Sequence, residues 1–229
     1  ERSTLANSIS NYLAGDLLQA LAEAPVQMAA QSGATRSYFA ALKLAVGQVG
    51  EAEQLIAPAG KTAGPLRELI AVVKFQSLAV LPVPTNSSGW LARSYYLQSR
   101  SQLPDALNAA RQTVKLAPEF GFGWARMAEL EFDFGHWRAA RHALARARRL
   151  SPRNAQSVSL EGFMALAAER PRAALDWFDR ALALDGSLPA AWVGRGLAEA
   201  QPGHDDRARR DFQVAATLEP QRGLFRSYL

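Results

Sequence analysis

Residues 123–152 read GWARMAELEFDFGHWRAARHALARARRLSP, which is the pattern of two amphipathic helices joined by a tight turn. Apolar and small side chains recur at three- and four-residue steps as far as Phe134, which predicts a helix over the first half. Gly135 marks the turn, and a second apolar stripe begins at Trp137. Pro152 ends the second helix because its nitrogen has no hydrogen to donate. The stretch therefore predicts an antiparallel helical hairpin.

The same pattern returns along the chain at a step of 34 residues. The series that keep this step are Trp90, Trp124 and Trp192; Ala106, Ala140, Ala174 and Ala208; Pro118, Pro152 and Pro220; and the small residues Ser94, Ala128, Gly162 and Gly196. Several series with one period indicate a tandem repeat. The repeat units are predicted at residues 87–120, 121–154, 155–188 and 189–220. Small residues are expected where the two helices approach most closely, since larger side chains would push the backbones apart.

This arrangement of tryptophan, small residue, alanine and closing proline resembles the tetratricopeptide repeat. The resemblance implies an all-α fold, a right-handed superhelical solenoid of antiparallel helix pairs. First helices would line a concave groove, and second helices would form the convex outside. The resemblance also implies a protein–protein interaction scaffold, but it does not identify the partner.

The ends of the chain follow the repeat less closely. Residues 1–86 are predicted to form divergent hairpins and a connector, which brings the expected total to about six or seven hairpins. A continuous solenoid is preferred to a second half-domain hinged at the connector. Residues 221–229 are predicted to begin a capping helix. Because the chain opens with Glu1 rather than methionine, we expect an excised piece of a longer protein, so a missing signal peptide says nothing about export.

The concave groove is predicted from the first-helix positions that lie opposite the packed stripe. These positions are Leu91, Tyr95, Gln98, Phe122, Arg126, Glu129, Phe132, Phe163, Leu166, Val193 and Leu197. Some tetratricopeptide proteins grip the carboxylate end of a peptide with lysines and asparagines on this face, and those residue types are missing here. The groove is therefore expected to prefer an apolar helix or an extended peptide with hydrophobic anchors. The alternative is that the chain fills this lane itself, as a spacer or a self-assembly segment.

Two ion pairs are predicted between the helices of single hairpins. Glu131 stands ten residues before Arg141, and Glu199 stands ten residues before Arg209. The matching positions of the other two units are apolar, so the charges are expected to change together, because an unpaired buried charge is costly.

The formal net charge is +5, and one predicted helix, residues 137–150, carries five arginines. Arg138, Arg146 and Arg149 are expected on the convex side, and nucleic-acid binding through them is a third and poorer alternative, because no aromatic residues are interleaved for stacking. The three histidines have no metal-ligand spacing and cysteine is absent. No catalytic pattern occurs. The sequence therefore predicts no enzyme, no cofactor and no metal.

The expected partner is a protein or peptide, with homo-oligomer formation possible. Membrane insertion is not expected, because no run approaches the ~20 apolar residues that a spanning helix needs. The chain also resembles the repeat-bearing tails of bacterial cell-envelope proteins that carry a FecR-like sensor domain. This resemblance implies a bacterial protein of the cell envelope or periplasm, with the cytoplasm as the alternative.

Overall fold

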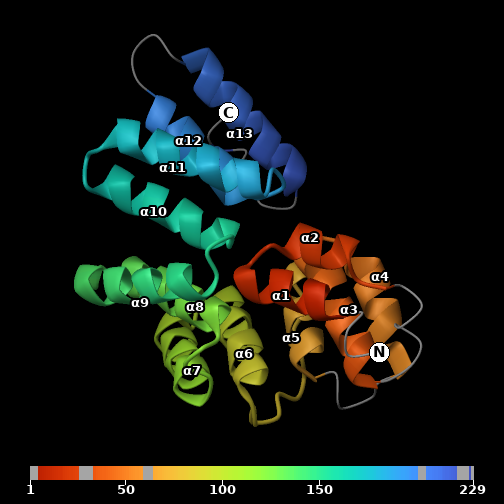
Figure 1. The fold of residues 1–229 in the computed structure, drawn as a ribbon. Helices are drawn as coiled ribbons and strands as arrows, with labels where there is room; N and C mark the ends of the chain where they lie inside the picture. The colour runs from red at the N-terminus through yellow and green to blue at the C-terminus, as the bar shows by residue number, and fades with distance from the viewer. Residues whose placement is uncertain (1–4, 26–32, 59–63, 201–204, 221–226, 228–229) are drawn as a thin grey trace. The chain divides into compact units, whose positions relative to one another are not determined.

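The computed structural model describes residues 5–25, 33–58, 64–200, 205–220 and 227. Within them the chain forms thirteen helices, and these described ranges contain no strand. Most consecutive helices pair as hairpins (Figure 1). The predicted all-helical solenoid of hairpins is confirmed. The predicted capping helix at 221–229 lies almost wholly outside the described residues.

The chain divides into two compact units, Glu1–Pro152 and Arg153–Leu229. The first unit holds α1 (Ala6–Ala14), α2 (Leu17–Ala22), α3 (Gly33–Ala45), α4 (Val49–Ile56), α5 (Gly64–Val73), α6 (Ser87–Ser99), α7 (Leu103–Leu116), α8 (Gly121–Asp133) and α9 (Trp137–Leu150). The second unit holds α10 (Ala155–Ala167), α11 (Pro171–Leu184), α12 (Pro189–Glu199) and α13 (Asp205–Leu218). The described helices make six hairpins, with α5 left single. The division falls within the predicted row of four repeats.

The turns between paired helices share one backbone device. A residue with a left-handed conformation follows the first helix, and the next two N–H groups of the turn close back onto the helix. This is the Schellman ending, which satisfies carbonyls that the helix leaves free. The left-handed residues of the described turns are Gly15, Gly47, Ser101, Gly135 and Glu169. Only glycine adopts this conformation without a steric cost, so Ser101 and Glu169 hold their turns under strain.

Replacing Glu169 (φ 56°) by glycine should raise the free energy of unfolding by about 1 kcal/mol, because it removes the left-handed strain. The opposite change at the equivalent turn, Gly135→Ala, should lower it by a similar amount. A methyl group at Gly135 would meet nothing within 4 Å, so only the backbone conformation is at issue. Urea unfolding followed by circular dichroism measures both. Two changes of the same sign would contradict the explanation.

The core of the second unit is built around the ring of Phe178, which is fully buried. Glycine makes room for this ring on both sides. A methyl group at Gly162 would lie 2.7 Å from the ring, and one at Gly194 would lie 2.2 Å from it. In the next hairpin Gly196 stands against Phe212 in the same way, at 2.6 Å. Large side chains on the second helices are thus matched by absent side chains on the first helices.

The first unit solves the same problem with other sizes. One repeat step before Gly162 and Phe178 the chain has Ala128 and Leu144, and both are buried. The smaller second-helix side chain allows a methyl group on the first helix. The size of the small residue in each hairpin therefore follows the size of the apolar residue that packs against it.

α5 is a first helix without a second one. It ends, like the others, in a left-handed residue, Phe75, but the chain then runs extended to Asn86 (Figure 1). We call residues 76–86 the connector. The Asn86 side chain caps α6 by accepting a hydrogen bond from the Gly89 N–H at 2.8 Å.

Candidate functional site

The predicted groove positions of α6 and α8 meet in a cluster formed by Tyr95, Arg126 and Glu129. The Arg126 guanidinium lies 4.1 Å from the centre of the Tyr95 ring, which is a cation–π contact. Its Nε donates to Ser94 Oγ (2.9 Å), its Nη2 to the Ser94 carbonyl (3.1 Å) and its Nη1 to Glu129 (2.9 Å). Because Arg126 is 1% exposed, these contacts hold a buried cation in place. We call these residues the Tyr95–Arg126 cluster.

Two pKa values report the low polarity around the cluster. Burial raises the pKa of Tyr95 to about 12, although Arg126 acts in the opposite direction. Burial, followed by the nearby Glu129 carboxylate, raises the pKa of Asp133 to about 6. The end of α8 thus carries two carboxylates beside one buried guanidinium, and it would attract a cationic group of a ligand.

Asp133→Asn should stabilise the fold at pH 8 and not at pH 3.5. A carboxyl whose folded pKa is raised holds its proton longer in the folded state, so stability falls as pH rises from about 4 to about 6. Asparagine cannot ionise and escapes this loss. Because Asp133 is exposed, solvent screening limits the gain to about 1 kcal/mol or less. Urea unfolding at the two pH values tests this, and an equal effect at both would contradict it.

The N-terminal helix α1 packs on one end of these groove positions. The Tyr12 ring stacks on the Phe122 ring with centroids 5.1 Å apart and meets the Tyr38 ring edge-on at 5.8 Å. The Ser151 hydroxyl donates to the Leu13 carbonyl at 2.6 Å. Burial raises the pKa of Tyr12 to about 12. The chain therefore covers Phe122 with its own helix.

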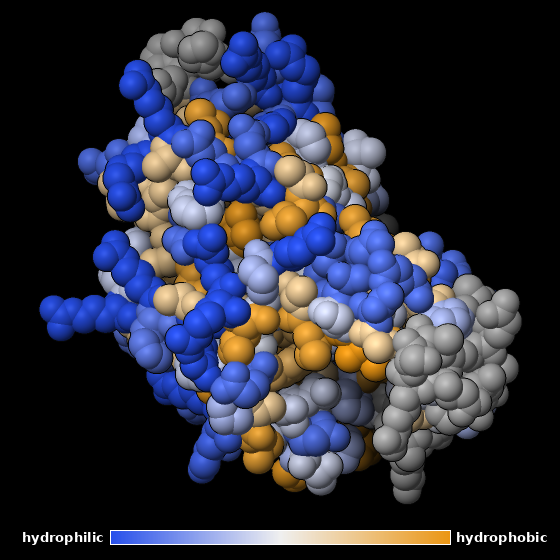
Figure 2. Space-filling model, in the orientation of Figure 1, coloured by the Kyte–Doolittle hydropathy of each residue, from blue (hydrophilic) through white to orange (hydrophobic). Residues whose placement is uncertain are grey.

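The other predicted groove residues differ in exposure. Leu91, Tyr95, Gln98, Phe122, Glu129 and Phe132 are half-buried on α6 and α8. Arg126 is a correction, since it is buried and turned into the Ser94 backbone rather than presented to a partner. Figure 2 shows apolar side chains lying between charged ones on the visible face.

The second unit corrects the groove more strongly. Val193 is buried in a core cluster with Ala208 and Phe212, because α13 packs over this face of α12. Phe163 packs edge-on against Phe178 at 5.0 Å, and Leu166 also lies against that core. Only Leu197, 38% exposed, is an open surface residue among the four groove positions of this unit.

The predicted Glu131–Arg141 ion pair is wrong. The buried Glu131 carboxylate accepts a hydrogen bond from Arg111 Nη2 at 2.9 Å and lies 2.7 Å from His136 Nδ1, whereas Arg141 is exposed. The turn brings His136 close because its N–H donates to the Glu131 carbonyl. Burial alone would raise the pKa of Glu131, but the hydrogen bonds from His136 and Arg111 hold it below its ordinary value. The carboxylate is paired as expected, but with α7 and the turn.

The predicted Glu199–Arg209 pair is wrong as well. Arg209 is exposed, and among the described residues its ion pair is with Asp206, at 3.9 Å. It lies on the solvent side of α13, whose buried face includes Ala208 and Phe212.

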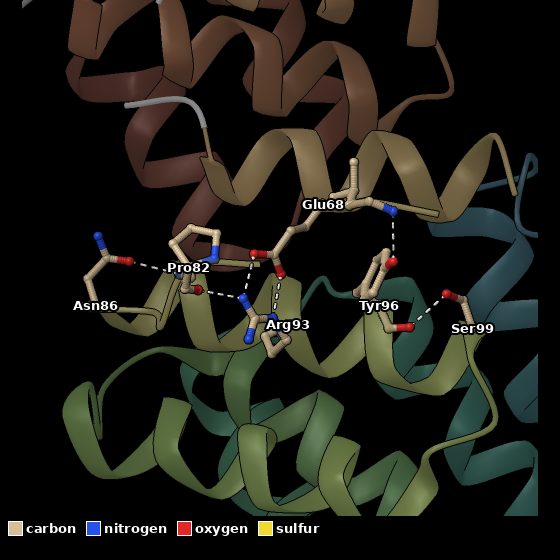
Figure 3. Close-up of polar contacts among 8 residues, drawn as sticks. Glu68, Pro82, Asn86, Arg93, Tyr96 and Ser99 are labelled. Atoms are coloured by element: carbon tan, nitrogen blue, oxygen red, sulfur yellow. Dashed lines mark hydrogen bonds and ion pairs between the residues drawn. The ribbon is translucent and has the colours of Figure 1, made fainter. Parts of the chain in front are cut away.

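Two arginine clusters escape the sequence prediction. Arg93 donates from Nε and Nη2 to both oxygens of Glu68, each at 3.0 Å, and from Nη2 to the Pro82 carbonyl at 2.6 Å (Figure 3). Glu68 is 5% exposed, so the carboxylate is buried and bidentately paired. This contact joins α5, the connector and α6.

Arg195 forms the equivalent cluster in the second unit. Its Nε and Nη2 donate to the two oxygens of Asp211 at 2.7 and 2.8 Å, and its Nη1 donates to Asp179 at 2.9 Å. Arg93 and Arg195 both stand three residues after a repeat tryptophan, where the second unit has Met127. A charge in this apolar position was the available signal, since such a charge needs a buried partner.

The arginine-rich helix α9 is largely exterior. Arg138 and Arg149 are exposed, and Figure 2 shows long hydrophilic side chains projecting at the edge where Figure 1 shows α9. Arg146 differs from the expected free side chain, because its Nη2 donates to Glu119 at 2.6 Å. The patch proposed for phosphate contacts is therefore partly neutralised within the chain.

A search of the described residues finds no group of three or more histidine, cysteine, aspartate or glutamate side chains that could hold a metal ion. None of the described helices has the length and apolar character to cross a bilayer.

No protein-family model and no curated protein sequence matches the chain. A tetratricopeptide-repeat protein of Thermus thermophilus, TTC0263, superposes with a TM-score of 0.54 at 17% identity, over 86% of this chain and 97% of that chain. A chain of the APC/C hetero-tetramer Cut9–Hcn1 gives 0.55 at 16% identity, over 95% of this chain and 38% of that chain. This chain has a tetratricopeptide-repeat fold. MamA also matches, with a TM-score of 0.46 at 17% identity over 80% of this chain and 96% of that chain.

Proposed function

We propose that the chain is a non-catalytic tetratricopeptide-repeat scaffold that binds a polypeptide segment along α6 and α8 of the first unit. The observation that carries this proposal is the packing of Tyr12 on Phe122, in which a short helix with an aromatic anchor lies on the predicted groove positions. The similarity to a chain of the Cut9–Hcn1 hetero-tetramer supports it, since that protein is part of a complex.

The chemistry of the surface favours a partner of mixed character. Leu91 and Phe132 offer half-buried apolar contacts, and hydrophobic anchors would gain free energy there. Glu129 and Asp133 stand beside them and favour a lysine or arginine on the same segment. An apolar helix with one basic side chain fits these requirements.

The second candidate is a spacer or self-assembly segment whose groove is filled from within. It is favoured by the cover that α1 places on Phe122 and by the core positions of Phe163 and Val193. Nucleic-acid binding is not favoured, because Arg146 is paired with Glu119. The cell-envelope location and the bacterial source stay predictions.

The test compares proteins captured from a lysate of the source organism by the immobilised full chain and by variants, with quantitative mass spectrometry. Gln98→Arg/Phe132→Ala alters the groove, and Arg138→Ala/Arg149→Ala is the matched change on the exposed face of α9. The proposal predicts a partner lost at least tenfold from the groove variant and retained by the α9 variant. Gln98→Arg alone repeats the test if the double variant melts early.

Equal capture by both variants would refute the groove. Loss of captured protein only from the α9 variant would move the binding surface to the outside. A concentration-dependent dimer in analytical ultracentrifugation, broken by the groove variant, would favour self-assembly.

A further inference from the structure

The connector carries the most exposed large apolar side chains of the described residues. Val80, Val83 and Phe75 are 80%, 77% and 70% exposed. Phe75, just before the connector, also holds a left-handed backbone (φ 56°), which is costly for a bulky residue. Exposed apolar side chains on a defined segment mark a contact surface.

Burial along the connector has a period of three. Leu78, Leu81 and Pro84 are half-buried, and every residue between them is exposed. A β-strand would alternate with a period of two, whereas a polyproline II helix has three residues per turn. Pro82 and Pro84 fix their own φ, and each biases the residue before it toward the same conformation. The connector therefore packs one ridge of a threefold helix on the body of the unit and leaves the others in solvent.

Polar contacts hold this ridge in place. The Leu78 N–H donates to the Tyr96 hydroxyl at 2.9 Å, and Arg93 donates to the Pro82 carbonyl at 2.6 Å (Figure 3). Pro84 lies where Gly89 leaves space, since a methyl group there would approach its Cβ to 3.1 Å. Both ends are thus fixed before any partner arrives, which reduces the entropy lost on binding.

We propose that the connector is a docking ligand, and that its partner is a domain with an aromatic-lined groove of the kind that recognises polyproline II segments. Val80 and Val83 are three residues apart and so share one outward ridge, with Pro82 on the neighbouring ridge. Aromatic grooves read this shape. Strand addition is disfavoured, because Pro82 and Pro84 have no N–H to offer a ladder. The surface is separate from the groove positions of α6 and α8.

The test titrates the ¹⁵N-labelled full chain with three purified proline-recognition domains, one each of the SH3, WW and EVH1 classes. Binding should shift the amide signals of residues 77–85, and Val80→Ser/Val83→Ser should weaken it at least tenfold. Both side chains are exposed, so this variant should keep its melting temperature. Leu116→Ser, which alters another exposed apolar side chain, is the matched control and should bind like the wild type.

Failure of all three domains to shift the connector signals would overturn the proposal. So would equal weakening by Leu116→Ser. Dimerisation of the chain alone that is abolished by Val80→Ser/Val83→Ser would also overturn it, because the occupant would then be a second copy. None of these outcomes depends on the groove of α6 and α8.

Discussion

Arg93→Ala is expected to lower the free energy of unfolding of the first unit by about 3–5 kcal/mol. The arginine makes two hydrogen bonds to Glu68, and the two side chains are 13% and 6% exposed. Removal of the guanidinium leaves a buried carboxylate without its counter-charge, and the Pro82 carbonyl loses its donor as well. Chemical unfolding followed by circular dichroism at 222 nm measures the loss.

Two further variants separate charge burial from packing. Glu68→Leu/Arg93→Leu removes both charges and should recover most of the lost stability, since apolar replacement of a buried pair is often neutral. Lys74→Ala breaks an ion pair with Glu53 that is exposed, at 36% and 42%, and should cost no more than about 1 kcal/mol. If Arg93→Ala and Lys74→Ala cost the same, the Glu68 contact does not hold the unit together as described.

Gly194→Ala should lower the free energy of unfolding of the second unit by about 1–3 kcal/mol. The added methyl group would lie 2.2 Å from two carbons of the Phe178 ring, which is fully buried and has no space to retreat. The better helix propensity of alanine offsets the cost only in part. Denaturant unfolding monitored by tryptophan fluorescence reports this change.

The matched control is Gly50→Ala, a helical position where an added methyl group meets nothing within 4 Å. It should be neutral or stabilising by up to about 1 kcal/mol. Gly194→Ala/Phe178→Leu should be more stable than additivity predicts, because the smaller side chain frees the volume that the methyl group needs. Strict additivity would contradict a steric origin.

The repeat step of 34 residues predicts the hairpins because each series has a local steric cause. Gly135 sits at a left-handed turn, Ala140 at a fully buried helix contact, and Pro152 after the end of α9. These requirements act within one hairpin or between neighbours, so the pattern of residues along the chain contains them.

The contacts that sequence reasoning missed join parts of the chain whose proximity no local pattern encodes. Tyr12 reaches Phe122 across four hairpins' length of chain, and Glu131 turns toward Arg111 instead of its own second helix. Arg126 occupies a groove position by spacing, yet its long side chain bends back onto the Ser94 backbone. Spacing fixes the direction of Cβ, but not the path of a flexible side chain beyond it.

The missing second helix after α5 also shifts the numbering of the repeat. The left-handed turn residues Ser101, Gly135 and Glu169 follow one another at intervals of 34, but Phe75 precedes Ser101 by only 26. Eight positions of a standard unit, 34 less 26, are absent there. A self-comparison of the chain at a constant offset loses its phase at this point. The earliest helices must therefore be aligned with the later ones by their turn residues, not by counting.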